Sequence, residues 1–233
     1  MIPARLDSKR FPRKIFANLG GKTLLGNVLE AAKKVKIFDE IIVAACSQEV
    51  IEICKEHGVK AVLTDPLLPN GTMRIISAIE KLGLVADVFV NWQADEPFIT
   101  EEVIKTLLTG NLETDIWTLK KEIDKQEAFE PSIVKVVTDL CDKALYFSRS
   151  LIPYQRGESA KYYKHIGLYA FTKKALDKIK KTHPTPLEEA EVLEQLRWLE
   201  NGLSIQVAST QEDVMGIDTE KDLALANILL FIN

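Results

Sequence analysis

The sequence predicts an α/β protein in which helices cover a largely parallel sheet. In the first half of the chain, apolar β-branched segments alternate with segments of helical period, as expected when helical crossovers join parallel strands. Size is the second observation, because 233 residues that are 46% hydrophobic can bury one large core, or a core plus an arm.

The elements expected in the first half follow from these patterns. We expect buried strands at 40–46 (EIIVAAC) and 86–92 (ADVFVNW), and helices at 23–35, 47–58 and 72–83. Gly58 and Gly83 stand where the second and third of these helices would end. Glycine suits the left-handed residue that commonly terminates a helix, so both boundaries gain support.

Between about 115 and 172 the pattern changes to short strand-like pieces. The pieces IVKVVTD, KALYFSR and HIGLYAF have no intervening helix long enough for a parallel crossover. We interpret this stretch as a β-rich excursion. More core sheet is the alternative, since no Gly/Ser-rich linker marks a separate domain.

One further helix is predicted over 185–202, TPLEEAEVLEQLRWLENG. Thr185 would cap its start, Pro186 would occupy the first helical position, and Gly202 would lie just past its end. Its acidic residues have the pattern of a solvated helix face, because charges gathered on one side of a helix usually contact water.

Charge and apolar content exclude several classes of protein. The formal net charge of −4 argues against general nucleic-acid binding. The most apolar stretch, 223–232, has about half of the roughly 20 residues that a membrane span requires, so we expect a cytoplasmic protein without a membrane segment. Cys46, Cys54 and Cys141 form no CxxC pair, and they indicate neither a disulfide framework nor a zinc site.

The opening segment MIPARLDSKRFPRK gathers cations in a chain that is negative overall. It carries Arg5, Lys9, Arg10, Arg13 and Lys14. The segment follows the stub of a strand and precedes a helix, where parallel α/β sheets bind ligands. Backbone amides and arginine side chains suit phosphate oxygens, so a phosphate-binding loop is one interpretation and a solvated basic loop is the other.

Two better-known phosphate loops are excluded. The stretch FANLGGKT at 16–23 ends like a Walker loop, but Phe16 replaces the required first glycine, and a turn is expected instead. No GxGxxG follows a strand, so the signature of a dinucleotide-binding oxidoreductase is missing.

Two segments near strand and helix ends carry acidic candidates for cation binding. Asp95 and Glu96 follow the strand predicted at 86–92, and strand geometry would point only one of them at a ligand such as Mg²⁺. Asp218 and Thr219 precede the last apolar stretch. Either residue could instead cap a final helix.

Seven segments occur in one order along the chain and carry a family resemblance. They are IPARLDSKRFPRK, NGTMR, QADEP, LYFSRSLIPYQR, KHIGLYAF, LEQLR and GIDTEKDL. Together they resemble the 3-deoxy-D-manno-octulosonate (KDO) cytidylyltransferases, also called CMP-KDO synthetases. The PARxxSxR pattern also suits sialic-acid cytidylyltransferases, whereas LYFSRSLIP with LEQLR is specific to the KDO enzymes.

The resemblance implies a three-layer α/β/α, Rossmann-like fold of the nucleotide-diphospho-sugar transferase type, with a mostly parallel sheet. It implies a single cytidylyltransferase domain over 1–233, with a β-rich arm at about 115–172 through which the family forms homodimers. The family has several apolar strand residues before IPAR, where this chain has Met1 and Ile2, so we expect a shortened N-terminal strand.

The implied activity is transfer of CMP from CTP to the anomeric hydroxyl of KDO, with release of pyrophosphate, on the way to lipopolysaccharide. Attack on the α-phosphate would be direct, with Mg²⁺ as cofactor and no covalent enzyme intermediate. Two alternatives stay open. One is a cytidylyltransferase for sialic acid or amino-KDO, and the other is a catalytically silent binding paralogue.

The resemblance also implies roles for individual residues. The catalytic positions are Arg5, Arg10, Lys14, Asp95 and Asp218. The CTP-binding positions are Arg5, Ser8, Arg10, Lys14, Thr72, Arg74 and Gln93. The KDO-binding positions are Arg149, Arg156, His165, Tyr169, Glu194 and Gln195. Asp95 and Asp218 match the magnesium ligands.

This chain departs from the family pattern at four positions. Arg13 and Ala94 stand where the family usually has glycine, Met73 stands at an acidic position, and Ser47 stands at a frequent aspartate. None of these departures removes a residue that the resemblance assigns to chemistry.

Overall fold

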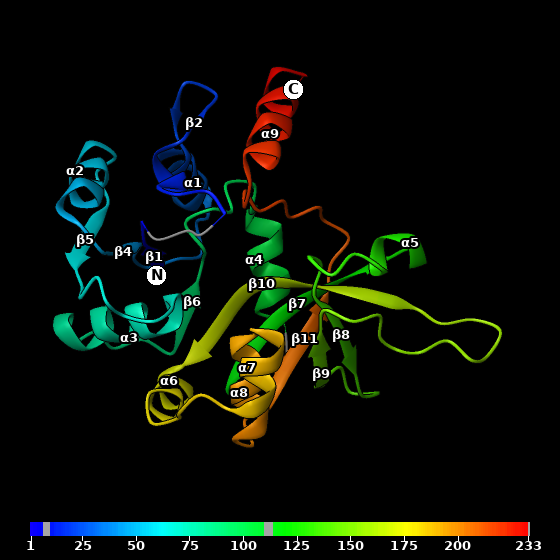
Figure 1. The fold of residues 1–233 in the computed structure, drawn as a ribbon. Coiled ribbons are helices and arrows are strands. Elements are labelled where there is room, and N and C mark those ends of the chain that lie inside the picture. The colour runs from blue at the N-terminus through cyan, green and yellow to red at the C-terminus, as the bar shows by residue number, and fades with distance from the viewer. Residues whose placement is uncertain (7–9, 110–113, 233) are drawn as a thin grey trace. The chain divides into compact units, whose positions relative to one another are not determined.

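The computed structural model describes residues 1–6, 10–109 and 114–232, which form two compact units (Figure 1). Unit 1 comprises Met1–Val85, Asn91–Ile104 and Asp213–Asn233. Unit 2 comprises Ala86–Val90 and Lys105–Glu212. Both units combine helices and strands, which confirms the predicted α/β class. The division into one domain with an arm, and the shortened first strand, stay predictions.

Unit 1 contains a parallel three-stranded sheet in the order β1-β4-β5. The strands are β1 (Ile2–Ala4), β4 (Ile42–Ala45) and β5 (Lys60–Leu63). All residues of β1 and β4 are buried, as their apolar composition predicts. The Trp92 N–H donates to the Met1 carbonyl at 3.0 Å, so the chain that follows β6 (Val88–Asn91) lies beside β1.

The three helices predicted for the first half are confirmed within unit 1. They are α1 (Leu24–Lys34), α2 (Gln48–Glu56) and α3 (Gly71–Leu82). The side chains of Thr23, Ser47 and Asn70 cap their first turns, so Ser47 serves where the family often has aspartate. Gly58 and Gly83 have left-handed φ angles of 62° and 61° at the predicted ends.

The stretch 16–23, which ends like a Walker loop, contains a β-hairpin. Strands β2 (Asn18–Leu19) and β3 (Lys22–Thr23) pair antiparallel around Gly20 and Gly21, whose φ angles are 60° and 86°. Two successive positive φ angles are what a two-residue hairpin turn requires, and glycine adopts them without strain. The turn predicted at this point is confirmed.

Arg13 occupies a backbone conformation that favours glycine, with φ of 56° and ψ of 25°. Its guanidinium pairs with Glu49 at 2.9 Å and lies 4.8 Å from the centroid of the Phe16 ring. A left-handed residue other than glycine costs roughly 1–2 kcal/mol, which explains why the family's glycine suits this position.

We expect Arg13→Gly to be more stable than Arg13→Ala by about 1 kcal/mol. Both variants lose the contacts with Glu49 and Phe16, but only glycine relieves the backbone strain. Urea unfolding of the two variants, followed by circular dichroism, measures the difference. Equal free energies of unfolding would show that the Arg13 backbone is not strained.

Unit 2 contains a six-stranded sheet in the order β11-β7-β10-β8-β9, with β6 also pairing β10. The central strands are β7 (Ile116–Ile123) and β10 (Tyr162–Thr172), which pair antiparallel. The others are β8 (Lys135–Thr138), β9 (Ala144–Ser148) and β11 (Ile205–Ser209). β11 runs parallel to β7, and β8 pairs antiparallel with β9 and β10, so the strand-like pieces predicted between 115 and 172 join one sheet.

The single helix predicted over 185–202 is wrong. Two helices occupy this stretch, α7 (Pro186–Glu191) and α8 (Glu194–Glu200). Val192 divides them with φ of 55° and ψ of 49°, a conformation in which a β-branched residue is strained by about 1–2 kcal/mol. Glu191 accepts hydrogen bonds from Ser148, the last residue of β9, and from Arg149, and these contacts stabilise the break.

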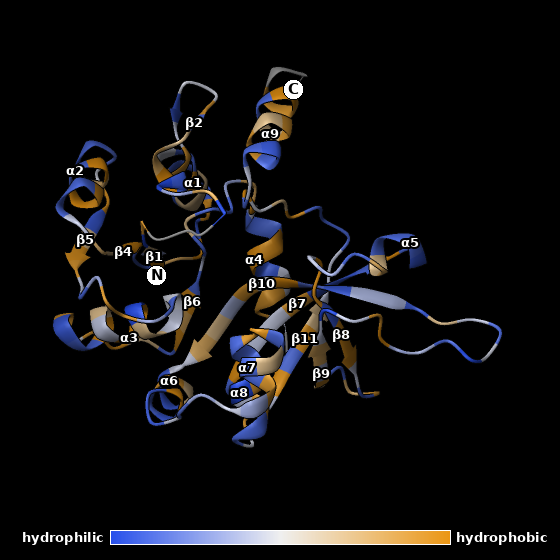
Figure 2. Ribbon diagram, viewed as in Figure 1, coloured by the Kyte–Doolittle hydropathy of each residue, from blue (hydrophilic) through white to orange (hydrophobic). Residues whose placement is uncertain are grey.

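The remaining described helices are α4 (Glu101–Leu107), α5 (Lys125–Ala128), α6 (Lys173–Ile179) and α9 (Glu220–Ile232). In unit 1, α1, α2 and α3 carry both hydrophobic and hydrophilic residues, as one-sided burial requires (Figure 2). None of the helices in the described ranges is long and apolar enough to cross a membrane.

Candidate active site

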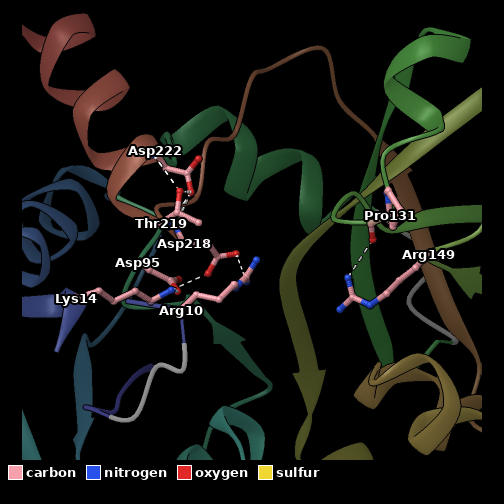
Figure 3. A network of polar contacts seen from close by, with 8 residues as sticks. All are labelled: Arg10, Lys14, Asp95, Pro131, Arg149, Asp218, Thr219 and Asp222. Carbon is pink, nitrogen blue, oxygen red and sulfur yellow. Dashed lines mark hydrogen bonds and ion pairs between the residues drawn. The ribbon is translucent and has the colours of Figure 1, made fainter. Parts of the chain in front are cut away.

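An ionic cluster joins three distant segments of unit 1 (Figure 3). The Lys14 ammonium lies 2.5 Å from an Asp95 carboxylate oxygen and 2.7 Å from an Asp218 carboxylate oxygen. Lys14 begins the short 3₁₀ helix Lys14–Phe16, Asp95 follows β6, and Asp218 precedes α9. The structure thus brings together three residues that the family resemblance assigned to catalysis.

Backbone contacts fix the two carboxylate-bearing segments against each other. The Ile217 N–H donates to the Asp95 carbonyl at 2.9 Å, which ties the segment before α9 to the one after β6. Asp222 accepts hydrogen bonds from the Asp218 N–H at 3.0 Å and the Thr219 N–H at 2.8 Å. In return the Thr219 hydroxyl accepts from the Asp222 N–H at 3.2 Å. Thr219 is therefore the helix cap, and the Asp218 side chain is left to bind cations.

Arg10 adds a second positive charge to Asp218, with Nη2 lying 2.8 Å from Oδ2. Burial opposes ionisation of Asp218, yet hydrogen bonds and charge from Lys14 and Arg10 lower its pKa. Burial likewise opposes the charge on Lys14, but Asp95 and Asp218 raise its pKa. Lys14 and Asp218 are therefore both charged near neutral pH.

Glu96 differs from its neighbour Asp95. Its Oε2 atom is buried and finds no hydrogen-bond partner among the described residues. Burial, together with the charges of Asp95 and Asp218, raises the pKa of Glu96 to about 8. Asp95 contacts Lys14, whereas the Glu96 carbonyl accepts from the Trp92 indole N–H at 2.9 Å.

The structure describes four of the five other positions assigned to CTP. Arg5 is exposed just after β1, and Ser8 lies outside the described residues. Arg74 is buried in α3, where its guanidinium donates to the Thr64 hydroxyl at 2.8 Å and the Asp65 carbonyl at 3.0 Å. Thr72 is buried in the same helix, and the Gln93 amide donates to Asn91 at 3.4 Å. The hydrogen bonds of Arg74 join α3 to residues 64–65.

Sequence reasoning missed Gly71, the first residue of α3. A Cβ atom at this position would lie 3.1 Å from Pro3 Cγ and 3.5 Å from Gln93 Oε1. Glycine therefore allows α3 to start against β1 and the segment after β6. Gly71 lies in the segment NGTMR that carries the family resemblance, and this is the signal that could have indicated its role.

The positions assigned to the acid sugar belong to unit 2. His165 lies between aromatic rings, with ring centroids 4.9 Å from Phe147 and 5.4 Å from Tyr169. Burial and the nearby Glu194 carboxylate raise the pKa of Tyr169 well above its usual value. Glu194 accepts from the Arg197 guanidinium at 2.8 Å.

The remaining three sugar positions differ in exposure. Gln195 is buried in α8, Arg156 is exposed, and Arg149 is half-buried, with Nη1 donating to the Pro131 carbonyl at 3.3 Å (Figure 3).

His165 should make the stability of the protein depend on pH. Burial lowers its pKa from 6.5 to about 3. Below about pH 6.5 the unfolded chain binds a proton that the folded protein excludes, so the free energy of unfolding should fall by roughly 1.4 kcal/mol per pH unit. This slope should shrink by that amount in His165→Phe, which retains a ring beside Phe147. Urea unfolding between about pH 6 and pH 4 measures both slopes, and identical slopes would contradict the prediction.

The chain is similar to known proteins along nearly its whole length. Residues 1–205 match the family described as Cytidylyltransferase. The 3-deoxy-manno-octulosonate cytidylyltransferase of Koribacter versatilis (strain Ellin345) is 44% identical over 228 residues, covering 96% of this chain and 86% of the relative. That of Chloroherpeton thalassium (strain ATCC 35110 / GB-78) is 43% identical over 238 residues, covering 99% of this chain and 96% of the relative.

Solved structures agree with these sequence similarities. CMP:2-keto-3-deoxy-manno-octonic acid synthetase complexed with CTP superimposes with a TM-score of 0.93 at 36% identity, covering 99% of this chain and 97% of that chain. A cytidylyltransferase from Leptospira borgpetersenii serovar Hardjo-bovis (strain JB197) has a TM-score of 0.65 at 18% identity, covering 100% and 85%, and shares the fold.

Proposed function

Because this chain belongs to the cytidylyltransferase family, we propose that it transfers CMP from CTP to the anomeric hydroxyl of KDO and releases pyrophosphate. The observation that carries the proposal is the cluster of Lys14, Asp95 and Asp218, supported by the likeness to a CMP-KDO synthetase solved with CTP. In this proposal the reaction is a cytoplasmic step toward lipopolysaccharide.

The cations of the cluster would bind the triphosphate. Lys14 and Arg10 carry donors that suit phosphate oxygens, and arginine can bind two of them at once. The sugar hydroxyl oxygen would attack the α-phosphorus and its proton would pass to water. The bond from the α-phosphorus to the α–β bridging oxygen would break, and pyrophosphate would leave. Positive charge from Arg10 and Lys14 would stabilise the departing group, and no bond to the enzyme is needed.

The two carboxylates form a donor set that fits Mg²⁺. Asp95 and Asp218 both contact one ammonium group, at 2.5 and 2.7 Å, so a cation already lies between them. Mg²⁺ is commonly held by one or two carboxylates together with substrate phosphates. Asp95 and Asp218 would hold the ion, which would supply charge neutralisation of the phosphates when bound.

Residues of unit 2 would select the acid sugar. The guanidinium of Arg149 suits the sugar carboxylate, and Arg156 would add a second charge. Tyr169, Glu194 and Gln195 provide donors and acceptors for several hydroxyl groups. His165 is uncharged at neutral pH because burial lowers its pKa to about 3, so it would act as a neutral hydrogen-bonding group.

Pyrophosphate release tests the proposed function. Purified protein with Mg²⁺ and CTP is assayed in parallel with KDO, amino-KDO and N-acetylneuraminate. Release with KDO at the highest kcat/KM is expected. A higher kcat/KM for another sugar would overturn the KDO assignment, and no release with any sugar would favour a silent binding paralogue.

The proposed assembly is a homodimer formed through the β-rich stretch at about 115–172. Several large apolar side chains of this stretch are exposed in a single chain, namely Phe129, Leu140, Leu145 and Tyr154. Burial of such side chains would favour association. Light scattering coupled to size exclusion should give twice the monomer mass, and a monomer at micromolar concentration would contradict this assembly.

A further inference from the structure

Glu191, the last residue of α7, contacts the segment that carries Arg149 through three oxygen atoms. Its Oε1 accepts from the Ser148 hydroxyl at 2.5 Å, and its Oε2 accepts from the Arg149 N–H at 2.9 Å. Its backbone carbonyl accepts from Arg149 Nε at 3.0 Å. The sequence pattern assigned Glu191 to a solvated helix face, and the structure contradicts this.

Lys135 contacts the backbone carbonyl of the same arginine. This lysine is fully buried, and its ammonium donates to the Arg149 carbonyl at 2.5 Å and the Ile133 carbonyl at 2.7 Å. Arg149 Nη1 in turn donates to the Pro131 carbonyl at 3.3 Å. The backbone N–H, the carbonyl, Nε and Nη1 of Arg149 are therefore all engaged, while Nη2 makes no hydrogen bond within the described chain.

The charge of Arg149 stays available despite the nearby acid. The Glu191 carboxylate binds a hydroxyl and a backbone N–H, whereas only its neutral carbonyl contacts the guanidinium. A carboxylate paired directly with the guanidinium would compete with an anionic ligand. The observed arrangement orients Arg149 and leaves its charge for another carboxylate.

The strained residue Val192 makes this arrangement possible. In an unbroken helix the Glu191 carbonyl would accept from the N–H of residue 195. That hydrogen bond would compete with the one that the carbonyl accepts from Arg149 Nε. The left-handed Val192 ends α7 directly after Glu191, and the residue is 77% exposed, so its own packing does not explain the strain. Strained residues persist where surrounding contacts fix them, and they gather at functional sites.

We propose that Glu191 is a positioning residue that holds Arg149 in the orientation that receives the sugar carboxylate. The inference rests on the proposed function and adds to it a residue that acts through Arg149 rather than on the substrate. Glu191→Ala should then weaken the use of the acid sugar and leave the use of CTP unchanged.

Steady-state kinetics test this split. Glu191→Ala should raise the KM for KDO by about 10- to 100-fold, the range for a lost hydrogen bond to a charged group, with the KM for CTP changed less than about twofold. Glu191→Gln retains one acceptor and should fall between wild type and Glu191→Ala. The matched control is Glu189→Ala, an exposed acid of the same helix, which should behave as wild type. Equal increases in both KM values would overturn the proposal.

A double-mutant cycle shows whether Glu191 acts through Arg149. Arg149→Ala alone should raise the KM for KDO, and adding Glu191→Ala should change it no further. Two independent effects that multiply would instead mean that Glu191 contacts the sugar itself or supports the fold generally. Thermal unfolding of each variant identifies a folding defect. If Glu191→Ala were unfolded, Glu191→Gln and Ser148→Ala would replace it in the double-mutant cycle.

Amide hydrogen exchange of Arg149 provides a measurement that needs no substrate. The Arg149 N–H should exchange faster in Glu191→Ala than in wild type or Glu189→Ala, because its carboxylate acceptor is lost. Unchanged exchange would overturn the positioning role. If the wild type released no pyrophosphate with KDO, the proposed function would be wrong, and the exchange rates would still decide whether Glu191 holds Arg149.

Discussion

Asp218→Ala is expected to lower kcat with CTP and KDO by about 10³-fold or more, with little loss of stability. Asp218 accepts hydrogen bonds from Lys14 and Arg10 and is one of two carboxylates that fit a divalent cation. Its side chain is 50% exposed, so truncation leaves no cavity in the core. Asp95→Ala should lower kcat to a similar extent, because both carboxylates would hold one ion.

Three measurements check the Asp218 prediction. Pyrophosphate release gives kcat, circular dichroism during thermal unfolding reports stability, and calorimetry in the presence of CTP reports Mg²⁺ binding, which should be lost. Glu220→Ala is the matched control, since this exposed acid lies two residues away in the first turn of α9. A kcat within tenfold of wild type in Asp218→Ala would contradict the proposed metal ligand.

Lys14→Met should weaken both CTP binding and the fold. The Lys14 side chain is 11% exposed and contacts Asp95 and Asp218, so its loss leaves Asp95 without this cation and Asp218 with Arg10 as its remaining cationic partner. We expect a loss of about 1–3 kcal/mol in the free energy of unfolding. A KM for CTP raised about 10- to 100-fold should accompany it, because a charged phosphate donor is removed.

A second substitution separates the two effects of Lys14→Met. Adding Asp218→Asn removes one of the two neighbouring carboxylate charges that lost Lys14, so the double variant should recover part of the lost stability and none of the activity. Lys22→Met provides the control, because the Lys22–Glu30 pair is exposed and should contribute less than about 1 kcal/mol. No change in stability on Lys14→Met would show that the cluster is not strongly coupled.

Local signals predicted much of the fold. Helices α2 and α3 were expected because their apolar period is clear, and Ser47 and Asn70 cap their starts through contacts within three residues. The helix expected over 185–202 was divided because Glu191 binds Ser148 and Arg149, which lie 43 and 42 residues away. Period and capping carry no information about such distant contacts.

The candidate site was predicted unevenly for the same reason. The residues alone indicated a cation near Asp95 and left Asp218 undecided between a cap and a ligand, and the family resemblance was needed to pair them. The hydrogen bonds of Asp222 explain the outcome, because the pattern Thr-x-x-Asp at 219–222 marks a reciprocal cap and frees Asp218. Glu191 gave no sequence signal, since a buried role and a solvated face produce the same polar pattern.

The order of the segments along the chain has a consequence for synthesis on the ribosome. Unit 2 is complete once residue 212 has been made, whereas unit 1 still lacks its last segment, Asp213–Asn233. Lys14 and Asp95 therefore emerge long before Asp218, which is 204 residues beyond Lys14. A nascent chain released before Asp218 would keep every residue assigned to the sugar and could not assemble the site for the nucleotide.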